Sequence, residues 1–101
     1  MNVGNSDAMP ERMLFDYEPT DHPRLIRLTV TNLNLSPDGI ESYPDRSSGE
    51  AGSLAARTVF AVEGVEALRL EGGEALVTLA EDAIAEMVMA EVIEAVRDLF
   101  L

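Results

Sequence analysis

Apolar and polar side chains alternate along two early segments of the chain, as in strands that bury one face. These segments are residues 13–18 and 25–31. The joining segment contains two prolines, which cannot sit in a continuing strand ladder, so it is predicted to turn and to make a hairpin of the pair. The side chains expected to point inward are Met13, Phe15, Tyr17, Ile26, Leu28 and Val30.

A second hairpin is predicted where two apolar runs, residues 65–71 and 74–80, flank Gly72-Gly73. Glycine tolerates the positive φ angles that a two-residue turn needs. Between the hairpins, residues 36–39 read Ser-Pro-Asp-Gly, a turn composition, and residues 40–43 are expected to add a brief strand.

Two helices are expected. Ser47 and Glu50 have the spacing of a capping box, which predicts a helix over residues 51–62 that ends at a left-handed Gly64. A longer helix is predicted from Ala83 to Phe100, a segment without glycine or proline. The inward residues expected on the first helix are Ala55, Val59 and Val62.

The long helix carries an apolar arc of about half its circumference, wider than the stripe of most surface helices. Burial in the core is the first interpretation of this width, and self-association of a small structural or regulatory domain is the alternative. The apolar face comprises Ile84, Val88, Val92, Ala95, Val96 and Leu99, widened by Met89, Ile93 and Phe100. The opposite face comprises Glu86, Glu91, Glu94, Arg97 and Asp98.

The element order strand, strand, helix, strand, strand, helix predicts an α+β domain of two layers. We expect an antiparallel sheet of about four strands with two helices on one face. The alternative is a ferredoxin-like unit, whose element order the chain follows from residue 25 onward. Residues 1–11 are expected to be a disordered leader and residues 12–101 a single domain.

Composition narrows the function classes. The net charge of −12 disfavours sequence-independent binding to nucleic acid and to anionic membrane surfaces. No apolar run approaches the ~20 residues of a membrane span, and the N-terminus lacks a signal-peptide pattern, so a cytoplasmic location is predicted. Cysteine and lysine are absent, which excludes thiolate and Schiff-base chemistry and cysteine ligation of an iron–sulfur cluster.

Candidate chemistry is sparse. His22 beside Asp21 is interpreted as part of a turn in which the aspartate bonds to its own backbone, and no catalytic residue, metal site or cofactor site is predicted. The Glu71-Gly72-Gly73-Glu74 segment offers too few oxygens for a hard cation. A protein-docking surface is the remaining candidate. Its predicted residues are the acidic side chains of the last helix, Glu86, Glu91, Glu94 and Asp98.

Three segments carry a further pattern. Residues 18–28 read EPTDHPRLIRL, residues 53–68 read SLAARTVFAVEGVEAL, and residues 76–79 read LVTL. In this order and spacing they resemble the PTPNPxxLKF, SPLAxxLFAIxGVxxVF and FITVTK segments of the N-terminal domain of the Nfu/NifU family. The resemblance covers nearly the whole chain from Met13 onward. The chain departs from the pattern at His22 and Arg24, where the family has asparagines.

The resemblance implies an α+β domain that accompanies iron–sulfur cluster carriers. In fuller members of the family, a second domain with a CxxC pair holds the cluster. This chain has no cysteine, so the expected role is that of a non-enzymatic accessory domain that docks to a carrier or client without binding a cluster itself.

Overall fold

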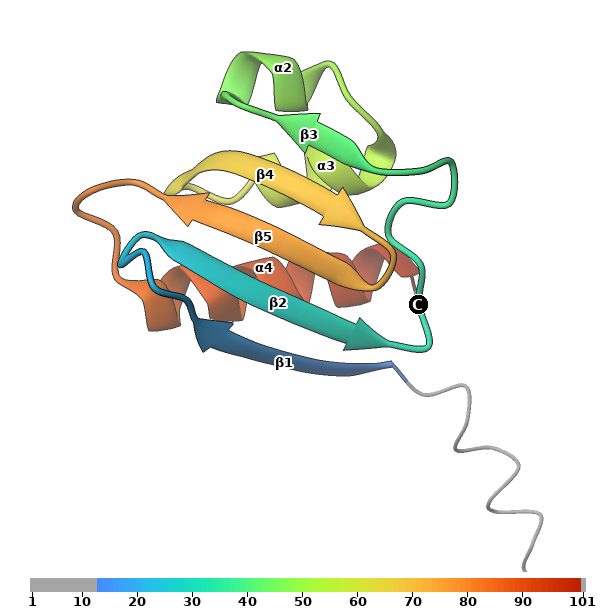
Figure 1. Cartoon of the computed structure of the whole chain (residues 1–101), viewed down its shortest axis with the longest axis horizontal. Helices are drawn as coiled ribbons and strands as arrows, with labels where there is room; N and C mark the ends of the chain where they lie inside the picture. The colour runs from blue at the N-terminus through green and yellow to red at the C-terminus, as the bar shows by residue number, and fades with distance from the viewer. Residues whose placement is uncertain (1–12, 101) are drawn as a thin grey trace, which may run out of the picture.

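The computed structural model describes residues 13–100, and the leader expected at residues 1–11 lies outside the described residues. Strands and helices follow one another along the chain in the predicted order, with one additional short helix (Figure 1). The elements are β1 (Leu14–Pro19), β2 (Leu25–Thr31), β3 (Glu41–Tyr43), α2 (Arg46–Glu50), α3 (Leu54–Phe60), β4 (Val65–Glu71), β5 (Glu74–Leu79) and α4 (Ala85–Phe100).

The strands form one antiparallel sheet in the order β1-β2-β5-β4-β3. Helices α3 and α4 lie on the same face of this sheet, while α2 sits at its β3 edge (Figure 1). The α+β, two-layer class is therefore confirmed. The expected short strand is β3, which becomes the fifth strand of the sheet by pairing Ser42 with Arg69 of β4.

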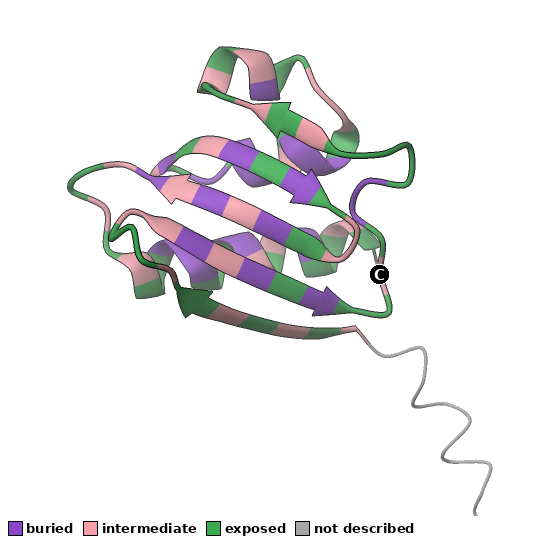
Figure 2. Cartoon of the chain, in the orientation of Figure 1, coloured by how far each residue is buried: buried purple, intermediate pink, exposed green. Residues whose placement is uncertain are grey.

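The core lies between the sheet and the two covering helices. Buried and exposed residues alternate along β2, β4 and β5, so each strand turns one side to the helices (Figure 2). The three inward residues expected on β2 are buried, and those expected on β1 are half-buried against the core. The largest fully buried side chains are Phe60, Leu28, Leu70, Met89, Val65, Val77, Val92 and Val96.

The middle of the sheet resembles a ferredoxin-like unit. Strands β2, β5 and β4 are adjacent in that order, with α3 following β2 and α4 following β5 in the chain. In a ferredoxin-like unit, the strand beside the first one follows the second helix. In this chain the strand at that position beside β2 is β1, which comes before β2 in the sequence. Strand β3 extends the other edge of the sheet, beside β4.

The helix expected over residues 51–62 is wrong in its bounds, because a separate short helix, α2, precedes this segment and only Leu54–Phe60 of it are helical, as α3. The capping box joins Asp45 to Ser48, not Ser47 to Glu50, and α2 then ends before Gly52. A Cβ at Gly52 would lie 2.4 Å from the Tyr43 ring, so glycine is required where the chain turns. Ser53 then caps α3 by accepting a hydrogen bond from the Ala56 amide.

The end of α3 also differs from the expectation. The helix stops at Phe60, so Gly64 is not its cap, although its φ of +102° is positive as expected. Gly64 instead belongs to the turn that leads into β4, where its carbonyl accepts from the Ala80 amide at 2.7 Å. The three predicted inward residues, Ala55, Val59 and Val62, are all buried.

The long helix α4 begins at Ala85, two residues later than predicted, and covers the β2–β5 part of the sheet (Figure 1). Most of its wide apolar arc is used within the domain. Met89 is fully buried and Ile93 packs partly buried against the core. Ile84, which was expected to face inward, is instead exposed because it precedes the first helical turn.

Candidate functional site

The four predicted docking residues, Glu86, Glu91, Glu94 and Asp98, are all exposed on α4. Glu91 and Glu94 are three residues apart, and Glu94 and Asp98 are four apart, so these carboxylates line one strip of the helix. Glu86 stands one to two turns nearer the helix start. We call these four residues the acidic face of α4.

The acidic face of α4 differs from the sheet in its ion pairs. Among residues 13–100, no side chain of the acidic face is in an ion pair. Arg97 is on the same helix, but its guanidinium lies over the Phe15 ring, 5.2 Å from the centroid, and so turns toward β1. The carboxylates that do pair with arginines are Glu18, Glu50, Glu66, Glu71 and Glu74, four of them on the sheet.

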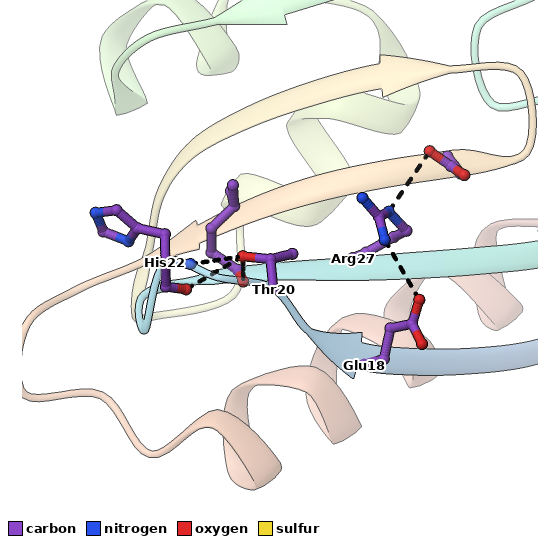
Figure 3. Close-up of polar contacts among 6 residues, drawn as sticks. Glu18, Thr20, His22 and Arg27 are labelled. Atoms are coloured by element: carbon purple, nitrogen blue, oxygen red, sulfur yellow. Dashed lines mark hydrogen bonds and ion pairs between the residues drawn. The ribbon is translucent and has the colours of Figure 1, made fainter.

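On the uncovered face of the sheet, arginines are paired with carboxylates of the same or neighbouring strands. Arg27 stands between Glu18 of β1 at 3.3 Å and Glu74 of β5 at 3.9 Å (Figure 3). Arg69 of β4 pairs with Glu71 at 3.2 Å. Positive and negative charges are therefore mixed on this face, whereas no arginine pairs with the acidic face of α4 among the described residues.

Like charges three and four residues apart on a helix repel one another by a few tenths of a kcal/mol per pair. On α4 this repulsion is uncompensated, since no arginine within the described residues pairs with these carboxylates. A cationic partner surface would relieve the repulsion, so the arrangement is suited to binding basic protein segments.

The turn that contains His22 has a structural role. The His22 amide donates to Thr20 Oγ1 at 3.2 Å, and the same hydroxyl donates to the Leu25 carbonyl at 2.8 Å (Figure 3). His22 Nδ1 accepts from the Arg24 amide at 3.2 Å. The prediction that Asp21 bonds to its own backbone is wrong, because the amides of this turn donate instead to Thr20 Oγ1 and His22 Nδ1.

A shallow hollow of about 300 Å³ lies where the turn before β4 meets the first turns of α4. Two exposed apolar side chains line it, Ile84 and Met87, whose exposed fractions are 60% and 59%. Carboxylates stand at its rim. They are Glu63, Asp82 and Glu91, the last of which belongs to the acidic face of α4.

A second hollow, of about 210 Å³, lies beside Leu54 and Phe100. The Glu41 carboxylate at its edge accepts hydrogen bonds from the Tyr43 hydroxyl at 2.5 Å and the Ser53 hydroxyl at 2.6 Å. These bonds join β3 to the start of α3, so the polar group at this hollow is already used to hold the fold together.

In the described part of the chain, no group of three or more histidine and acidic side chains is gathered where it could hold a metal ion. No helix within residues 13–100 combines the length and apolar character needed to cross a membrane.

Comparison with known proteins finds similarity in the structure of the chain. No family model and no curated protein matches the sequence. The crystal structure of protein SAV1430 from Staphylococcus aureus is similar, with a TM-score of 0.65 at 15% identity, covering 83% of this chain and 96% of that one. The solution NMR structure of SAV1430 has a TM-score of 0.54 at 20% identity, with coverage of 79% and 85%. The likeness shows a shared fold.

Sequence reasoning missed the apolar part of the site. Ile84 was assigned to the core because it fits the helical period of the buried residues, and Met87 drew no attention. The available signal was the position of Met87 on the polar side of the helix, one turn before Glu91.

Proposed function

We propose that this domain is a non-enzymatic protein-interaction module that docks on a basic partner through the acidic face of α4. The observation that carries the proposal is the difference in pairing. Four carboxylates on the strands (Glu18, Glu66, Glu71 and Glu74) pair with arginines, whereas Glu86, Glu91, Glu94 and Asp98 have no ion pair among the described residues. Unpaired charges on one side of a molecule steer and select oppositely charged partners.

The pathway is proposed from the resemblance to the Nfu/NifU N-terminal domain. Its three motif segments fall on consecutive parts of one architecture: the β1–β2 hairpin, the α3–β4 unit and β5. We infer that the partner is an iron–sulfur cluster carrier or a client protein in the cytoplasm. The chain itself has no cysteine to ligate a cluster, so its contribution is contact.

The first experiment compares two triple variants with equal charge changes. Glu91→Gln/Glu94→Gln/Asp98→Asn removes three charges from the acidic face of α4. The control, Asp16→Asn/Asp21→Asn/Asp38→Asn, removes three exposed charges elsewhere. Each bait is used for anaerobic capture from a native lysate at two salt concentrations, and the bound proteins are identified by mass.

The proposal expects cluster carriers or cluster-containing clients to bind the wild type and the control, and to be lost with the α4 variant and at high salt. Exposed charge pairs are screened beyond about 8 Å at physiological ionic strength, which is the reason for the salt dependence. Equal capture by both variants contradicts the acidic face as the docking surface. Recovery of the bait's own copies alone supports the self-associating domain instead.

A further inference from the structure

We propose that the hollow at the start of α4 is an anchor site for one apolar side chain carried on a lysine- or arginine-rich segment of the partner. This inference rests on the proposed function and deepens it by naming the chemistry of the bound segment. The acidic face of α4 would attract the basic segment, and the hollow would set which residue of the segment lies at the start of α4.

The exposed apolar lining of the site is formed by Ile84 and Met87, which are among the most exposed large apolar residues of the described chain. They are three residues apart, a spacing at which side chains near a helix start lie together. The hollow beside them, about 300 Å³, lies at the small end of the range of binding pockets and has room for a single leucine, methionine or phenylalanine side chain.

Helix capping gives an independent reason to regard Ile84 as more than structural. Ile84 directly precedes α4, and its carbonyl accepts from the Met87 and Val88 amides at 3.0 Å, which is the geometry of an N-cap residue. Isoleucine is among the poorest N-cap residues because it has no side-chain acceptor. The other two helices of the described chain are capped by Asp45 and Ser53. Local stability therefore does not explain the isoleucine.

Charge decides what kind of segment fits. The rim carboxylates Glu63, Asp82 and Glu91 have no ion pair within residues 13–100, and no basic residue lines the hollow. An acidic segment would place like charges together, at an unfavourable energy, while a second copy of this chain would bring its own net charge of −12. A basic segment with one apolar side chain would pair its charges with these carboxylates and bury its apolar side chain against Ile84 and Met87.

The test selects peptides from a random 12-residue display library on the intact chain at low salt. We expect the enriched peptides to carry several lysines or arginines around one large apolar residue. The dissociation constant of the most enriched peptide is then measured by fluorescence polarisation on wild type, Ile84→Ser, Met87→Gln and the matched control Ile40→Ser, since Ile40 is exposed to 58% but lies outside the site.

Binding about ten-fold weaker in Ile84→Ser and in Met87→Gln, with Ile40→Ser unchanged, supports the anchor site. Basic peptides that bind all four proteins equally overturn the anchor site but leave the acidic docking face standing, because charge alone then accounts for binding. A library that enriches no basic peptide on the wild type also overturns the anchor site. In that case the lysate comparison of the two triple variants decides the proposed function separately.

Discussion

The two glycines at the tip of the β4–β5 hairpin have different physical requirements. Gly72 has a φ of +60°, and a Cβ there would meet nothing within 4 Å. At Gly73, a Cβ would lie 2.6 Å from the backbone oxygen of Val30. The tip is also tied to the loop after β2, since the Val30 amide donates to the Gly73 carbonyl and the Leu35 amide to the Gly72 carbonyl, both at 2.7 Å.

We therefore expect Gly73→Ala to destabilise the domain more than Gly72→Ala. The first change forces two backbone segments apart, at about 2–3 kcal/mol. The second costs about 1 kcal/mol for an L-residue in the left-handed region. Urea unfolding measures both free energies, and equal values for the two variants would contradict the close approach to Val30.

At the scale of elements, one side chain of the short helix α2 bonds it to two neighbouring elements. Helices of five residues are not stable by themselves. The Arg46 guanidinium donates to the carbonyls of Phe60, Val62 and Val65, and it also lies over the Phe60 ring, 5.9 Å from its centroid. One arginine thus joins α2 to the end of α3 and the start of β4.

Arg46→Lys is expected to lower the free energy of unfolding by about 1–2 kcal/mol. Lysine is a point charge without the planar fork that serves several acceptors, so part-buried carbonyls lose their donors. Arg57→Lys is the matched control, because Arg57 is exposed on α3, and it should change stability by less than about 0.5 kcal/mol. The same urea titration compares them. A similar loss in both variants would show that the carbonyl contacts do not matter.

At the scale of the whole molecule, ion pairing differs between the sheet and α4. Four carboxylates on the strands pair with arginines, whereas the acidic face of α4 has no ion pair among the described residues and adds four negative charges to the net charge of −12. Self-repulsion of this net charge destabilises the folded state. The exposed ion pairs act in the opposite direction, but such pairs contribute only about 0–1 kcal/mol each.

We expect the repulsion to outweigh the pairs, so that sodium chloride stabilises the domain. Raising the salt from about 0.01 M to 1 M shortens the screening length from about 30 Å to about 3 Å. A gain of about 1 kcal/mol would raise the melting temperature by about 4–8 °C, measured by thermal unfolding. The α4 triple variant should respond less. A melting temperature that falls with salt would mean that the ion pairs dominate.

Much of the fold was predictable because its signals are local. Period-two alternation identified β1 and β2, and the paired glycines identified the β4–β5 hairpin. The acidic face of α4 followed from helical spacing, and its exposure is confirmed. Each of these features depends on residues that are neighbours along the chain, so the order of residue types alone specified them.

Other features depended on contacts between distant segments. The sequence could not say that Gly52 packs against Tyr43 and ends a helix, nor that the two hairpins join through pairing of β2 with β5. Helical periodicity determined that Ile84 and Val88 share a side, but only the tertiary structure decided where α4 begins, which leaves Ile84 exposed and Val88 buried. The same packing sets which carboxylates face arginines, because ion pairs across strands form only after the sheet has assembled.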